Sequence, residues 1–168
     1  VVYTTEEAHS SIEKSTLLAG FGRDNLRIVA TDKSTRAMSP DSLATEIGHD
    51  LLSGRVPAAV IASCGSTGVT AFDPVADIVE VAAPHSIWVH VDAAMAGAAM
   101  MLPECRHLWD GVEGADSISW NPHKWMGTIL DTSLFYVCDP QHLIRVMSTN
   151  PSYLKSDVDG EATQYRDW

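Results

Sequence analysis

Short apolar runs alternate with stretches of helical periodicity along most of the chain. The apolar runs predict six strands, at residues 1–4, 26–31, 58–63, 87–91, 117–120 and 133–137. Most of these runs are continuously apolar, which is typical of strands that are covered on both faces of a sheet. The pattern therefore favours a sheet buried between layers of helices.

Helical segments with recognisable ends lie between the predicted strands. The pair Ser39-Pro40 predicts a helix start, with an N-cap followed by proline at the first helical position, and Gly54 predicts its end. The pair Asp73-Pro74 repeats this start signal. Two more helices are expected at about residues 8–18 and 141–147. This alternation predicts an α/β fold, with three αβα layers and a mostly parallel central sheet.

Residues 150–168 differ from the rest of the chain. They are polar, contain Pro151 and Gly160, and lack a strong periodicity, so a long loop is expected there. We therefore divide the chain into a partial domain core at residues 1–149 and a loop with the start of a following segment at residues 150–168. Because no terminal helix follows to cover the sheet, we expect a piece of a longer protein.

Composition and charge narrow the classes of partner. The chain has 168 residues, 45% hydrophobic and 20% charged, which is ordinary for a globular protein. Its formal net charge of −11 argues against nucleic acid or an anionic membrane surface as a partner. Three scattered cysteines without CxxC spacing predict free thiols in a reducing cytoplasm, with neither a disulfide framework nor a metal site. No apolar run is long enough to span a bilayer, and no signal peptide is visible.

The most informative residues follow the predicted strands, where ligands bind in parallel sheets. Lys124 lies in the run Asn121-Pro122-His123-Lys124-Trp125. A lysine held among apolar and aromatic groups is poorly solvated as an ammonium, so its amine becomes available for Schiff-base chemistry. Asp92 ends an apolar strand, where a carboxylate needs a cationic partner or caps the next segment. A lysine and an aspartate in these places predict a pyridoxal phosphate site.

Other residues are weaker candidates, each with an alternative explanation. His9 is expected either to stack on a ring or to be an ordinary residue near a helix start. Ala94 is expected either to let a flat ring approach the backbone or to fill the core. Ser63, together with Ser66 and Thr67, belongs to a glycine-containing turn whose hydroxyl groups could contact a phosphate. The turn has neither the P-loop nor the Rossmann spacing, so this signal is weak alone. Tyr153 is either a general acid on a loop that closes or an exposed aromatic.

Two further polar residues lie in the run around Lys124. Asn121 is a candidate donor to a phosphate group, and His123 is a candidate contact for the phosphate or for a substrate carboxylate. Both positions follow the predicted strand at residues 117–120, at the edge of the sheet where a ligand is expected.

A series of short motifs spans nearly the whole chain. They are Ala8-His9-Ser10-Ser11, Trp88-Val89-His90-Val91-Asp92-Ala93-Ala94 with Ala96-Gly97, Arg106-His107-Leu108, Gly111-Val112-Glu113, Ala115-Asp116-Ser117, Asn121-Pro122-His123-Lys124-Trp125, Pro151 with Tyr153-Leu154-Lys155, and Tyr165-Arg166 with Trp168. With these motifs the chain resembles the group II pyridoxal phosphate-dependent amino acid decarboxylases, most closely the aromatic L-amino acid decarboxylase branch. The resemblance implies the large domain of fold type I pyridoxal phosphate enzymes.

The resemblance also implies roles for single residues. Lys124 would bind the cofactor covalently, Asp92 would pair with the pyridine nitrogen, and His9 and Ala94 would lie on opposite faces of the ring. Ser63, Asn121 and His123 would lie close to the cofactor and the substrate. Tyr153, on a mobile catalytic loop, would return a proton after carbon dioxide leaves.

The implied function is a cytoplasmic lyase of amino acid metabolism, which converts an L-amino acid, aromatic by this likeness, to its amine and carbon dioxide. Relatives that make aldehydes commonly have phenylalanine at the position of Tyr153, so tyrosine favours simple decarboxylation. The alternatives are aldehyde synthase or aminotransferase chemistry, or a fragment that is inactive alone. The family acts as a homodimer with active sites at the interface. Met95, Ser63 and Ser66 depart from the pattern of the aromatic branch and leave the substrate side chain open.

Overall fold

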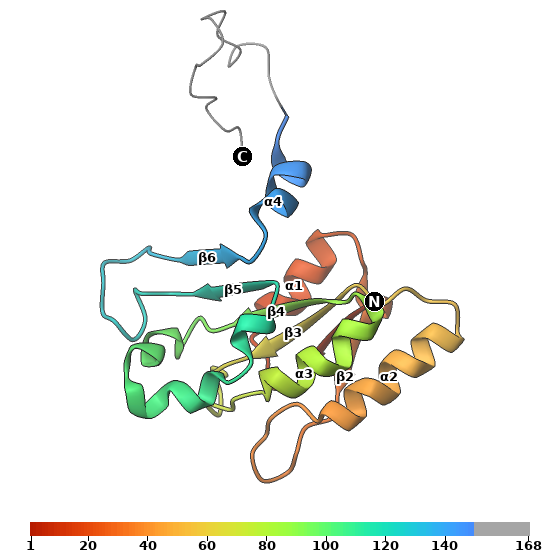
Figure 1. Cartoon of the computed structure of the whole chain (residues 1–168), viewed down its shortest axis with the longest axis horizontal. Helices are drawn as coiled ribbons and strands as arrows, with labels where there is room; N and C mark the ends of the chain where they lie inside the picture. Colours follow the sequence, from red (N-terminus) through yellow and green to blue (C-terminus); the bar gives the residue numbers. More distant parts are fainter. Residues whose placement is uncertain (150–168) are drawn as a thin grey trace, which may run out of the picture. The chain divides into compact units, whose positions relative to one another are not determined.

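The computed structural model describes residues 1–149, whose largest element is a six-stranded sheet (Figure 1). All six predicted strands are present, with slightly different ends. They are β1 (Val2–Thr5), β2 (Leu26–Val29), β3 (Ala59–Ser63), β4 (Trp88–Asp92), β5 (Ser117–Trp120) and β6 (Leu134–Val137). The apolar runs therefore located the strands correctly, and every strand except β6 contains at least one buried residue.

The strand order is β2-β1-β3-β4-β5-β6. The pairs β1–β2, β1–β3, β3–β4 and β4–β5 are all parallel. In Figure 1 the arrow of β6 runs opposite to that of β5. The prediction of a mostly parallel sheet in an α/β fold is confirmed, and the carboxyl ends of β3, β4 and β5 meet at one edge.

Within residues 1–149, four α-helices accompany the strands: α1 (Ser11–Leu18), α2 (Pro40–Leu52), α3 (Val75–Ala82) and α4 (Pro140–Met147). Helix α2 begins as predicted, since the side chain of Ser39 accepts a hydrogen bond from the amide of Ser42 at 3.3 Å. The predicted cap of α3 is wrong, because no side chain caps this helix. Asp73 instead accepts hydrogen bonds from two distant backbone amides.

The two faces of the sheet differ in chemistry. One face is apolar and belongs to the buried core, with the side chains of Tyr3, Val60, Val89 and Val91. Helices α2 and α3 pack against this core. The opposite face carries alternate residues of the same strands, and at β4 these are Trp88, His90 and Asp92. Helix α1 supplies residues to this second face. The layers follow the αβα prediction, but the second face is only partly covered by the described residues.

Between β4 and β5 the chain forms short 3₁₀ segments that the sequence pattern did not predict. They are η3 (Gly97–Met101), η4 (Pro103–Trp109) and η5 (Val112–Gly114). Two others are η1 (Arg23–Asn25) and η2 (Ala83–His85). A Cβ atom at Gly97 would lie 2.3 Å from the Cβ of Trp120, so only glycine fits where this connection crosses β5.

By its internal contacts the chain forms one compact unit at Val1–Tyr136, and a second begins at Val137. The proposed division at residues 149 and 150 stays a prediction. Within residues 1–149, no helix combines the length and the apolar character needed to cross a membrane. All three cysteines are free thiols, as predicted.

Candidate active site

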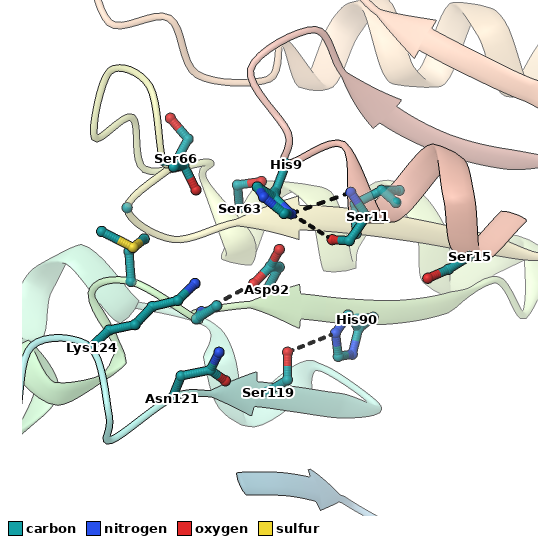
Figure 2. Close-up of a pocket in the computed structure, with 15 residues that line it drawn as sticks. His9, Ser11, Ser15, Ser63, Ser66, His90, Asp92, Ser119, Asn121 and Lys124 are labelled. Atoms are coloured by element: carbon teal, nitrogen blue, oxygen red, sulfur yellow. Dashed lines mark hydrogen bonds between the residues drawn. The ribbon is translucent and has the colours of Figure 1, made fainter. Parts of the chain in front are cut away.

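A cavity of about 400 Å³ lies at the carboxyl ends of the central strands (Figure 2). Its wall contains six of the eight residues predicted for the site: His9, Ser63, Asp92, Ala94, Asn121 and Lys124. The parallel register brings them together, since Ser63 pairs with Asp92 across β3 and β4, and Asp92 pairs with Ser119 across β4 and β5. Residues far apart in sequence thus share one edge of the sheet.

Asp92 is the last residue of β4 and is half-buried. One carboxylate oxygen, Oδ1, accepts a hydrogen bond from the amide of Ala94 at 3.0 Å. This bond makes a short turn after the strand, so Asp92 does act on the following segment, as the alternative explanation proposed. Among residues 1–149, no lysine, arginine or histidine nitrogen lies within 4.0 Å of this carboxylate. Asp92 therefore keeps its charge available to a cationic ligand.

Lys124 lies in the turn that follows β5, where its amide donates to the carbonyl of Asn121 at 2.9 Å. Figure 2 shows its side chain directed toward the Asp92 side of the cavity. In the described part of the chain no carboxylate lies within 4.0 Å of its amine. The expected aromatic surroundings are not found, because Trp125 is 51% exposed and does not line the cavity. The cavity that Lys124 lines has a mixed wall, in which hydroxyl and amide groups lie beside the apolar side chains of Ile12 and Met95.

His9 lies in the segment between β1 and α1. Its Nδ1 accepts a hydrogen bond from the amide of Ser11 at 3.3 Å and lies 2.8 Å from the Ser11 hydroxyl. The ring is exposed, yet it forms part of the cavity wall. An exposed imidazole whose Nδ1 is already bound is oriented for contact with a ligand through its ring face or its Nε2.

The turn after β3 forms another part of the wall, through Ser63, Ser66 and Thr67. It is held by Asp73, whose Oδ2 accepts from the amide of Ser63 at 2.7 Å and whose own amide donates to the Ser63 carbonyl at 2.9 Å. Burial raises the pKa of Asp73, although the amide hydrogen bonds act in the opposite direction. The sequence pattern did not reveal this role.

The cavity wall also contains residues that were not among the predicted site residues, and two of these are the polar residues His90 and Ser119. They lie on neighbouring strands, and His90 precedes Asp92 on the same face of β4. Burial lowers the pKa of His90, and the charge of Asp92 partly opposes this. The available signal was the strand alternation, because Trp88, His90 and Asp92 occupy every second position.

Two predicted site residues are not placed at the cavity. His123 does not line it, and its Nδ1 lies 2.6 Å from the carbonyl oxygen of Thr132, in the connection that leads to β6. The preceding turn thus directs the imidazole toward that connection, and a role at the phosphate stays a prediction. Tyr153 lies outside the described residues, so its role also stays a prediction.

The residues of the cavity fit pyridoxal phosphate. An amine at Lys124 can bind its aldehyde carbon, a carboxylate at Asp92 can pair with its ring nitrogen, and Ala94 leaves space for a flat ring. Hydroxyl and amide groups are present for the phosphate, at Ser63 and Asn121 among others, but no arginine lines the cavity within the described residues. Within these residues no cluster of metal-ligating side chains occurs either.

Comparison with known proteins gives the same assignment. The whole chain, residues 1–168, matches the pyridoxal-dependent decarboxylase conserved domain. It is 43% identical to tyrosine/DOPA decarboxylase 5 of Papaver somniferum and 42% identical to a phenylacetaldehyde synthase of a Rosa hybrid cultivar, in each case over 100% of this chain. It covers 33% and 34% of these two relatives, about one third of their length.

A solved structure of Oryza sativa TDC with PLP and tryptamine is also similar. It superposes with a TM-score of 0.91 at 43% identity, over 98% of this chain and 34% of that chain. The fold, the cavity and the match over the full sequence agree, and the chain belongs to the family of pyridoxal-dependent decarboxylases.

Proposed function

We propose that the protein containing this chain decarboxylates an aromatic L-amino acid, with pyridoxal phosphate as its cofactor, to give the amine and carbon dioxide. The observation that carries the proposal is that Lys124 and Asp92 line one cavity while neither is paired with another charged side chain of the described residues. Similarity to a tyrosine/DOPA decarboxylase and to a structure that holds tryptamine supports an aromatic substrate.

Each residue of the cavity has a distinct task in this proposal. When bound, pyridoxal phosphate supplies an electron sink for the electron pair left when the carboxylate departs. Lys124 would hold the cofactor through its Nζ, and Asp92 would keep a proton on the ring nitrogen, because a nearby carboxylate stabilises the cationic form. Ala94 would border the ring on one face and His9 on the other. Ser63, Asn121 and His123 would contact the cofactor or the substrate.

The product is set by what happens to the α-carbon after decarboxylation. Tyr153 would donate a proton to this carbon and so give the amine. The similarity to a phenylacetaldehyde synthase supports a second candidate, an aldehyde-forming reaction on the same cofactor. We favour the amine because a tyrosine, and not a phenylalanine, occupies position 153.

We also propose that the complete protein is a homodimer in the cytoplasm. An active site at the interface agrees with a cavity that lacks an arginine for the phosphate among the described residues. Free thiols at all three cysteines agree with a reducing compartment.

The proposal is tested by Lys124→Ala in the protein made from its complete reading frame. We expect the visible absorbance of the bound cofactor, and carbon dioxide release from aromatic amino acids, to be lost. Lys33→Ala, which changes an exposed lysine of the segment between β2 and α2, is the matched control and should leave both unchanged. A wild-type protein that stays colourless with pyridoxal phosphate would refute the proposal.

Tyr153→Phe distinguishes the two reactions. If Tyr153 returns the proton, the variant should consume dioxygen and water and form aldehyde, carbon dioxide, ammonia and hydrogen peroxide at the expense of amine. Chromatography of the products and a peroxide assay measure this change. An unchanged product ratio would show that another group donates this proton. Aldehyde from the wild-type protein would favour the second candidate.

A further inference from the structure

His90 and Ser119 line the cavity, and the proposed reaction assigns no task to either. The Nε2 of His90 lies 3.2 Å from the Ser119 hydroxyl oxygen, a contact drawn in Figure 2. The Nδ1 of the same ring lies 2.8 Å from the hydroxyl oxygen of Ser117. Both ring nitrogens therefore contact β5, and Ser119 is the cross-strand partner of Asp92.

Trp88 sets the direction of these hydrogen bonds. Its indole Nε1 can only donate, and it donates to the Ser117 hydroxyl oxygen at 2.8 Å. Ser117 is buried, and within the described part of the chain the only acceptor for its own hydrogen is Nδ1 of His90. Because a buried hydroxyl hydrogen without an acceptor is unfavourable, Ser117 donates to Nδ1.

The proton of a neutral His90 ring must then be on Nε2, where it is donated to the Ser119 hydroxyl oxygen. Burial lowers the pKa of His90 and so favours the neutral ring. The negative charge of Asp92 acts in the opposite direction but does not outweigh burial. Phe135 of β6 stacks on the ring, at 6.0 Å between centroids and 30° between planes, and helps to hold its orientation. Ser119 lines the cavity, and among residues 1–149 no acceptor contacts the hydrogen of its hydroxyl group.

We propose that Ser119 is a further binding residue, whose hydroxyl hydrogen is directed by His90 toward an oxygen of the bound cofactor beside Asp92. His90 is a positioning residue in this inference, since it acts through Ser119 and not on the ligand. The inference rests on the proposed function, which identifies the ligand as pyridoxal phosphate. It gives a role to a histidine of the cavity wall whose two ring nitrogens both contact serine hydroxyls.

The first test needs no cofactor. In the ¹⁵N-labelled protein, nuclear magnetic resonance of the ring nitrogens should show His90 neutral with its proton on Nε2, and comparison with His90→Gln identifies its signals. Ser117→Ala should lose this preference, because the donor to Nδ1 is removed. A proton on Nδ1, or a charged ring at neutral pH, would overturn the inference.

The second test measures binding of pyridoxal phosphate by absorbance titration of the complete protein. Ser119→Ala should raise the Kd by about 3- to 10-fold, the effect of one lost hydrogen bond. Ser119→Thr keeps the hydroxyl and should restore binding, whereas Ser53→Ala, an exposed serine of the α2 end, is the neutral control. An unchanged Kd in Ser119→Ala would overturn this inference alone. Absence of binding by the wild-type protein would refute the proposed function and this inference with it.

Discussion

Single residues decide the shape of the cavity wall, and Gly65 is the clearest case. It lies in the turn after β3 with a φ of +80°, and a Cβ atom at this position would lie 2.3 Å from the Cβ of Ala96. The turn therefore needs glycine for its backbone conformation and for the close approach of the segment that follows Asp92. The two segments that carry Ser63 and Ala94 are in contact because no side chain separates them.

Gly65→Ala should destabilise the protein by about 2–4 kcal/mol, since it combines a left-handed backbone with an overlap of atoms. Urea unfolding followed by circular dichroism measures this free energy. The matched control is Gly48→Ala inside α2, where a Cβ atom meets nothing within 4 Å. This second change should stabilise the helix by up to about 1 kcal/mol. Equal effects of the two substitutions would contradict the structural explanation.

At the scale of elements, one carboxylate joins two strands and a helix on the face away from the cavity. Asp50 of α2 accepts hydrogen bonds from the hydroxyl of Tyr3 on β1 at 3.0 Å and from the guanidinium of Arg27 on β2 at 2.7 Å and 3.1 Å. Burial alone would raise the pKa of Asp50. The hydrogen bonds from Arg27 and Tyr3 and the positive charge of Arg27 together outweigh burial, so the pKa is lowered. Burial and the same carboxylate raise the pKa of Tyr3.

Asp50→Asn should lower the free energy of unfolding at pH 7 by about 3 kcal/mol, because it leaves the Arg27 charge without its partner. The folded-state pKa is lowered, so the charged form stabilises the protein above the ordinary value of 3.8. This contribution to the free energy of unfolding is lost as the pH falls below 3.8 and through the pKa of the folded state. In that pH range the free energies of unfolding of wild type and Asp50→Asn should become more similar.

Urea titrations of both proteins from pH 7 to pH 3 measure this difference. Glu80→Gln, an exposed position on α3, is the control and should differ little from wild type at any pH. A difference between wild type and Asp50→Asn that stays constant down to pH 3 would contradict the assigned hydrogen bonds.

At the scale of the whole molecule, several large apolar side chains of the described residues are exposed. Ile28 on β2 is 57% exposed, and Ile129 and Leu130 in the connection between β5 and β6 are 84% and 77% exposed. The chain spans about one third of the length of the curated relatives that it matches. Such surfaces are typical of faces that another part of a protein or a partner covers.

We therefore expect the protein from the complete reading frame to sediment as a homodimer at micromolar concentration, the assembly that we proposed above. Analytical ultracentrifugation gives the mass directly, and the subunit mass from mass spectrometry is the reference. A monomer that nevertheless binds pyridoxal phosphate and releases carbon dioxide would contradict the proposed assembly, although not the proposed reaction.

The sequence by itself determined the strands, the start of α2 and the positions of Lys124 and Asp92. These features are encoded locally, since apolar runs, a serine cap and a short motif can be recognised without their neighbours in space. The parallel order of the strands then follows from the alternation of strands and helices, and with it the meeting of Asp92 and Lys124 at one edge.

Only the tertiary structure decided which groups contact one another. Asp73 looked like a helix cap and instead holds the turn at Ser63. Trp125 and His123 flank Lys124 in the sequence, yet neither lines the cavity, because the turn after β5 directs them elsewhere. The ring nitrogens of His90 contact serine hydroxyls on the neighbouring strand β5, and this contact is visible only in the folded structure. Hydrogen bonds between distant segments depend on register and side-chain direction, which no local pattern contains.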